Sequence, residues 1–209
     1  MSILITFVIL IFSAIVHEVA HGLMAEKLGD DTARLEGRIT LNPIPHIDPM
    51  GTILLPLFMW YATQGHFWFG AAKPVPVNFN NLKNPKLGMA LVSLAGPLAN
   101  FVLAILFVIP IKLGVVNSIS YPILITGIFI NLLLGTFNLV PIPPLDGSKI
   151  LVSFFSDHWA EKILRLEKYG FILVMLFVLM NWFGYILAPV IAGFWKIFAL
   201  DPMALSLLF

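Results

Sequence analysis

The chain has 209 residues, of which 59% are hydrophobic and only 11% are charged, and its net charge is +1. Because soluble domains carry about 25% charged residues, this composition excludes a solvated globular enzyme, a disordered protein and a nucleic-acid binder with a broad basic face. The sequence has no cysteine, which excludes disulfides and thiolate metal sites. The composition indicates a polytopic membrane protein that is surrounded by the lipid bilayer.

Several apolar segments are long enough, or nearly so, to cross a bilayer as helices, since a crossing takes about 20 residues. In chain order these segments are 3–27, 87–111, 120–140, 169–187 and 190–207. The sequence therefore predicts an all-α polytopic membrane protein with five full transmembrane helices.

A further apolar stretch, 51–62, is too short to cross and contains Pro56, so it predicts a re-entrant segment. The basic residues support this interpretation. If 51–62 returns to the side from which it entered, ten of the twelve lysines and arginines share one side, while Lys112 lies on the other and Lys196 lies within the last apolar segment. The positive-inside rule makes the shared side cytoplasmic, so the N-terminus is expected outside.

Two connecting segments are expected to form a small β or extended element at the cytoplasmic side. Apolar and polar residues alternate over 33–41, which predicts a half-buried strand at the membrane surface. In 70–78, Pro74 and Pro76 exclude helix and favour an extended chain.

The first apolar segment contains titratable residues, which are costly inside a membrane and therefore indicate function. His17 and His21 are four residues apart, so they share one helix face and can bind one zinc ion. Glu18 can reach a water on that metal without being a ligand, which suits a general base. This H-E-x-x-H pattern predicts a buried zinc site nearer the cytoplasmic face.

A third protein ligand is expected, because catalytic zinc sites usually have three plus a water. Asp146 is favoured because Pro141, Pro143 and Pro144 break the preceding helix and allow the chain to enter a cavity. The alternatives are His46 and Asp48, on the loop before 51–62. A loop histidine more often bonds to the backbone, and an aspartate before proline is a common turn residue.

Three motifs in order resemble the site-2 protease family of intramembrane zinc metalloproteases. They are H-E-V-A-H at 17–21, A-G-P-L-A-N at 95–100 and N-L-V-P-I-P-P-L-D-G at 138–147. The loop H-I-D-P-M-G-T and the stretch F-G-A-A-K-P-V-P-V-N resemble the compact prokaryotic branch, without PDZ or CBS domains. The resemblance implies a single intramembrane metalloprotease domain over 1–209, with a catalytic core at about 3–150 and accessory transmembrane helices at about 169–207.

The resemblance also implies a role for each matching residue. His17, His21 and Asp146 would bind one zinc ion per chain, and Glu18 would activate water. Asn138 would contact the substrate, where its amide can donate to a developing oxyanion. Gly96 and Asn100 are interpreted first as packing residues, because small residues and asparagine often join helices in membranes.

The predicted function is zinc-dependent hydrolysis of peptide bonds in or beside the transmembrane segment of a membrane-protein substrate, as in regulated intramembrane proteolysis. The strand at 33–41 is expected to present an edge to which an unwound substrate adds by β-pairing, with the extended segment 70–78 serving instead of that strand or as its partner. The rival hypothesis is a zinc-binding transporter or scaffold without proteolysis. A transporter needs polar groups along several spans, whereas the ionisable residues here cluster at one depth.

Overall fold

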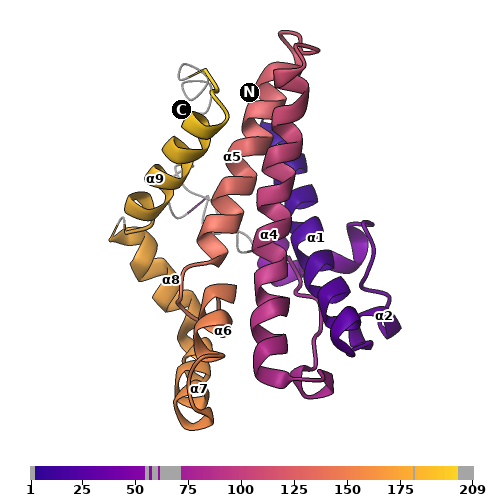
Figure 1. Cartoon of the computed structure of the whole chain (residues 1–209), viewed down its shortest axis with the longest axis vertical. Coiled ribbons are helices and arrows are strands. Elements are labelled where there is room, and N and C mark those ends of the chain that lie inside the picture. The colour runs from indigo at the N-terminus through magenta and orange to yellow at the C-terminus, as the bar shows by residue number, and fades with distance from the viewer. Residues whose placement is uncertain (1–2, 55–56, 58–60, 62–71, 181, 202–209) are drawn as a thin grey trace.

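The computed structural model describes residues 3–54, 57, 61, 72–180 and 182–201. Three long helices form its centre: α1 (Ile3–Leu28), α4 (Pro85–Lys112) and α5 (Ser120–Asn138) (Figure 1). Each helix contacts the other two, and each is long and apolar enough to cross a membrane. The prediction of apolar helices at 3–27, 87–111 and 120–140 is confirmed.

Local sequence explains where α4 begins and how closely it packs. The side chain of Asn84 accepts a hydrogen bond from the Leu87 N–H, and Pro85 occupies the first turn, where no backbone donor is needed. A Cβ atom at Gly135 of α5 would lie 3.2 Å from the Pro97 carbonyl oxygen of α4. The glycine therefore allows the two helix backbones to approach closely.

The last two helices differ from the prediction. Helix α8 (Gly170–Leu179) ends before the expected boundary at 187, and α9 (Trp182–Ile197) continues through Pro189, where a break was expected. The ten residues of α8 rise only about 15 Å, roughly half of a bilayer core. The predicted boundaries at 187 and 190 are therefore wrong. The predicted start at 169 agrees with the start of α8 at Gly170, and the predicted end at 207 lies outside the described residues.

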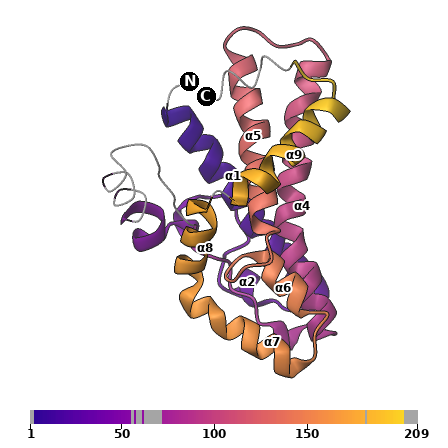
Figure 2. The same ribbon diagram turned by 90° about the vertical axis from the view of Figure 1, so that its left-hand side faces the viewer.

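These two helices pack on different parts of the central bundle. Trp195 of α9 is buried against Ile128 and Leu132 of α5. Val174 and Phe177 of α8 form a separate cluster with the chain that leaves α5, at Phe137, Val140 and Leu145. Helix α8 therefore supports the loop that leads into α6 (Asp146–Val152) (Figure 2).

The strand predicted at 33–41 is wrong, and the described residues contain no strand. Helix α2 (Thr32–Leu35) and turns occupy this segment. Leu35 is 84% exposed whereas Arg38 is only 6% exposed, so the alternation does not separate a buried apolar face from a polar one. The carboxylate of Asp30 accepts hydrogen bonds from the N–H and hydroxyl of Thr32, which starts a helical turn, and Gly37 turns the chain with φ of +63°.

Short helices and turns lead from there to α4: η1 (Ile44–His46), the π-helical η2 (Pro49–Leu54) and η3 (Phe79–Asn81). Half of the predicted re-entrant segment 51–62 lies outside the described residues, namely 55, 56, 58–60 and 62. Residues 72–78 form neither helix nor strand. They lie alongside the end of α1, where the Val75 N–H donates to Glu18 and the Asn78 N–H donates to Asp30.

Asp30 fastens this segment to the end of α1. Burial alone would raise the pKa of Asp30, but hydrogen bonds from Thr32, the Asn81 side chain and the Asn78 N–H outweigh it and lower the pKa. The carboxylate is thus ionised at neutral pH and joins three parts of the chain.

Helix α7 (Asp157–Leu164) and η4 (Arg165–Tyr169) follow α6 at one end of the molecule. Figure 1 places α2 and α7 toward this end, and the start of α1 and the end of α9 toward the opposite end.

Candidate functional site

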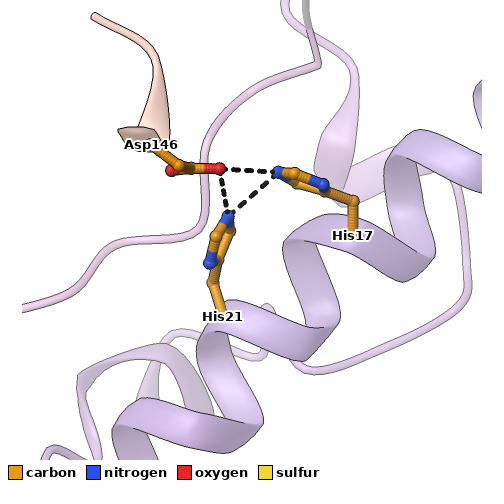
Figure 3. A group of neighbouring side chains, drawn as sticks. All are labelled: His17, His21 and Asp146. Carbon is orange, nitrogen blue, oxygen red and sulfur yellow. Dashed lines mark hydrogen bonds and ion pairs between the residues drawn. The ribbon is translucent and has the colours of Figure 1, made fainter. Parts of the chain in front are cut away.

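His17 and His21 project from one face of α1 toward Asp146, the first residue of α6 (Figure 3). The two Nε2 atoms lie 3.0 Å apart, and Asp146 Oδ2 lies 3.1 Å from His17 Nε2 and 3.2 Å from His21 Nε2. All three side chains are buried. Residues that are distant in sequence thus bring three possible ligand atoms to the corners of a nearly equilateral triangle.

The other ring nitrogen of each histidine is already used. His21 Nδ1 lies 2.7 Å from the Val92 carbonyl oxygen, and His17 Nδ1 lies 2.7 Å from Asn100 Oδ1. A carbonyl oxygen only accepts, so in both rings Nδ1–H is the donor. The Nε2 atom of each ring then faces the Asp146 carboxylate, and a cation held between the three atoms would satisfy all of them. Such outer hydrogen bonds accompany metal-binding histidines.

The spacing of the three atoms suits zinc. Ligands at about 2.0–2.1 Å in a tetrahedral site lie about 3.3–3.4 Å from one another, close to the separations of 3.0–3.2 Å found here. The backbone of α4 also leaves room: a Cβ atom at Gly96 would lie 2.5 Å from His21 Nε2 and 2.6 Å from His17 Nε2. The two histidines and Asp146 form a candidate zinc site.

The electrostatics of Asp146 agree with this assignment. Burial alone would raise the pKa of Asp146, but hydrogen bonds with His17 and His21 outweigh burial and lower the pKa well below its usual value. The carboxylate is therefore ionised at neutral pH. An anionic oxygen beside two imidazole nitrogens is a donor set that zinc accepts.

The loop before α6 brings Asp146 to the histidines. Prolines prevent α5 from continuing, and Leu145 is extended with ψ of 154°. Gly147 lies so close to the Leu139 and Val140 backbone that a Cβ atom there would overlap the Leu139 carbonyl. Ser148 donates to the Leu145 carbonyl oxygen, which closes the turn. Close backbone packing within the loop stabilises it, and so does the packing of α8 against it.

Glu18 lies beside the candidate zinc ligands but is not one of them. Its Oε2 accepts a hydrogen bond of 2.8 Å from the Val75 N–H. Glu18 is half-buried and lines a cavity of about 260 Å³. The same cavity is lined by the three candidate ligands, by Asn138 and Lys149, and by residues of the 72–79 segment, namely Pro74, Val75, Val77 and Phe79.

Arg38 holds the segment that contacts Glu18, a role that sequence reasoning missed. Its guanidinium is buried and donates to the carbonyl oxygens of Lys73 (2.9 Å) and Pro74 (3.2 Å), directly before Val75. The Lys73 N–H donates to the His46 carbonyl oxygen. The only signal in the sequence was an arginine among apolar neighbours, which the strand interpretation placed on a solvated face.

The alternative third ligands, His46 and Asp48, have other partners. His46 Nε2–H donates to the Thr40 carbonyl oxygen at 2.9 Å. Asp48 Oδ2 accepts from the Gly51 N–H, and the Asp48 N–H donates to the Thr52 hydroxyl. Among the described residues, the group that could hold a metal ion comprises His17, His21 and Asp146.

Asn138 and Lys149 are the remaining polar residues with long side chains in the cavity wall. Asn138 is half-buried at the end of α5, where one N–H of its amide donates to the Leu134 carbonyl oxygen. The second N–H of that amide is available for another acceptor. Lys149 follows Asp146 by three residues on α6, which places both on one helix face. Sequence reasoning gave Lys149 no role.

Comparisons with known proteins agree with the geometry. The family model described as Peptidase family M50 matches residues 110–182. The chain is 39% identical to YwhC of Bacillus subtilis, provisionally named a zinc metalloprotease, over 87% of this chain and 83% of that protein. It is 29% identical to the zinc metalloprotease MJ0392 of Methanocaldococcus jannaschii, over 79% of this chain and 36% of that protein. No solved structure matches the chain significantly.

Proposed function

The chain belongs to peptidase family M50, the site-2 protease family of zinc metalloproteases, and from this premise we propose that it hydrolyses peptide bonds in or beside transmembrane segments of membrane proteins. The observation that carries the proposal is the His17–His21–Asp146 group, which is buried among helices long and apolar enough to cross a membrane. A protease site at such a depth favours substrates that are themselves embedded in the bilayer.

In this proposal His17, His21 and Asp146 hold one zinc ion per chain. When bound, the zinc supplies Lewis-acid activation of water and of the scissile carbonyl group. Asn100 and the Val92 carbonyl keep each imidazole in the tautomer that exposes its Nε2 lone pair.

Glu18 acts as the general base and then as the general acid. It takes a proton from the attacking water and delivers that proton to the nitrogen of the leaving amine. The contact with the Val75 N–H supports this role, because it orients the carboxylate at the cavity wall without supplying a competing positive charge.

Asn138 stabilises the carbonyl oxygen of the scissile bond as negative charge develops on it. Support comes from its position in the cavity wall and from the second N–H of its amide. A donor fixed in a site that excludes water acts most strongly on charge that appears only in the transition state.

A helical substrate must unwind before attack, because its backbone carbonyls are bonded within the helix. The sequence offered 70–78 as an alternative to 33–41, and we assign the docking of the unwound chain to its described part, residues 72–78. Pro74, Val75 and Val77 line the cavity, and Arg38 holds the backbone immediately before Val75.

The proposed orientation places the N-terminus outside and the active site nearer the cytoplasm. The end of the bundle that carries α2 and α7 (Figure 1) also carries basic residues, with Lys27 in the last turn of α1, Arg34 in α2 and Lys162 in α7. His21 lies near this end of α1, closer to Leu28 than to Ile3.

The proposal is tested by comparing membranes of cells that produce the protein with membranes of cells that produce the Glu18→Gln variant. We expect new protein termini, found by mass spectrometry, in or beside transmembrane segments in the first sample alone. Identical termini in both samples, with zinc bound to both proteins, would favour the zinc-binding scaffold instead.

A further inference from the structure

We propose that Asn131 of α5 is a positioning residue for the zinc site, because it fixes the direction of a hydrogen-bond chain that ends at His17. The chain runs from α5 through Asn100 of α4 to the histidine on α1. This inference rests on the proposed zinc site and on no step of peptide hydrolysis.

The contact nearest the site is between His17 and Asn100. His17 Nδ1–H donates to Asn100 Oδ1 at 2.7 Å, while the amide nitrogen of Asn100 donates to Asn131 Oδ1 at 2.9 Å and to the Ser13 carbonyl oxygen at 3.2 Å. Both N–H groups of Asn100 are therefore used. If this amide were reversed, its oxygen would face two acceptors, and its nitrogen would face His17 Nδ1 and favour the wrong tautomer.

Asn131 is fixed in the same way. Its amide nitrogen donates to the Ser13 hydroxyl oxygen and to the Gly127 carbonyl oxygen, each at 2.9 Å. A backbone carbonyl cannot donate, so the Gly127 carbonyl fixes the direction of the Asn131 amide, and Asn131 together with the Ser13 carbonyl then fixes the direction of the Asn100 amide. Asn131 Oδ1 must then face Asn100, and the His17 Nε2 lone pair must face the other ligands.

Because these groups are buried, each polar atom of the hydrogen-bond chain needs a partner. Ser13, Asn100 and Asn131 are all fully buried, in helices that are otherwise apolar. A polar group without a partner in such surroundings is energetically costly, so a fully satisfied network holds one arrangement. Asparagines often join membrane helices by hydrogen bonds that serve only to hold the helices together. The distinguishing feature here is that the fixed direction ends on a metal ligand.

The test measures zinc affinity by chelator competition in detergent-purified protein. Asn131→Leu removes the acceptor for Asn100, and we expect zinc binding to weaken by about 10–100-fold, the usual effect of losing such an outer contact. The visible spectrum of the Co²⁺-loaded protein should also change. The matched control is Thr136→Val, a buried residue on the same helix whose hydroxyl has no hydrogen-bond partner among the described residues. This control should bind zinc as the wild type does.

A second variant, Asn131→Thr, keeps the test decisive if the leucine protein does not fold. Its hydroxyl can donate to the Gly127 carbonyl oxygen, as Thr126 donates to Pro122 in the same helix. It is too short to replace the acceptor for Asn100, so weaker zinc binding is again expected. Wild-type affinity and an unchanged Co²⁺ spectrum in folded Asn131→Thr would overturn the inference. Absence of zinc from the wild type would instead overturn the proposed metal site.

Discussion

Glu18→Gln is expected to leave zinc bound and to reduce the rate of peptide hydrolysis by about 10²–10⁴-fold. Glutamine has nearly the same size and can still accept from the Val75 N–H, but it cannot take a proton from water. The loss should appear in kcat, because proton transfer belongs to the transition state. Zinc per chain and the rate of cleavage of an identified substrate are the two quantities to measure.

Glu26→Gln is the matched control. Glu26 lies on the same helix, eight residues later, and its carboxylate pairs with Arg34 at the protein surface. We expect this variant to cleave at the wild-type rate. A Glu18→Gln protein that retains full activity would show that another group serves as the base.

Gly96→Ala is expected to abolish zinc binding with a single added carbon. A Cβ atom at this position would lie 2.5–2.6 Å from the Nε2 atoms of both histidines, where a bound ion must sit. Alanine favours a helix interior over glycine by about 1 kcal/mol, so instability of α4 would not explain the loss. Metal content and the thermal unfolding temperature, measured on the same sample, separate the two effects.

Gly193→Ala in α9 provides the control for this substitution. A Cβ atom there would meet no atom outside its own helix backbone within 4 Å among the described residues, so full zinc content is expected. If Gly96→Ala bound zinc at the wild-type level, the metal could not lie between the two histidines as proposed.

Features encoded over short distances in the sequence could be predicted. The three long helices follow from apolar length alone, and the pairing of His17 with His21 follows from the helical repeat. The convergence of Asp146 on them was favoured, because prolines after α5 had to end the helix. The structure supports that choice over His46 and Asp48, whose side chains have partners within their own loop.

Features that depend on contacts between distant segments could not be predicted. Alternation over 33–41 suggested a strand, but Asp30 turns the chain by hydrogen bonding to Thr32. Asn100 was interpreted as a packing residue, since nothing in α4 alone indicates that His17 lies opposite. The polar Asn131 within an apolar helix was a signal that a search for intramembrane polar residues would have found.

The C-terminal helices show the same limit. The sequence indicated apolar segments without a role, whereas Val174 and Phe177 of α8 pack on the loop that carries Asp146. A Cβ atom at Gly170 would lie 2.5 Å from the Pro144 ring, so the start of α8 also contacts this loop closely. Helix α8 therefore helps to position a proposed zinc ligand.

The most direct test of the zinc site is the metal content of detergent-purified protein, for the wild type beside His21→Ala and Asp146→Ala. We predict about one zinc ion per chain in the wild type, because three ligands and a water complete a catalytic site, and little or none in either variant. Full zinc in Asp146→Ala would contradict the assignment of the third ligand. A folded wild type that binds no zinc would contradict the metal site itself.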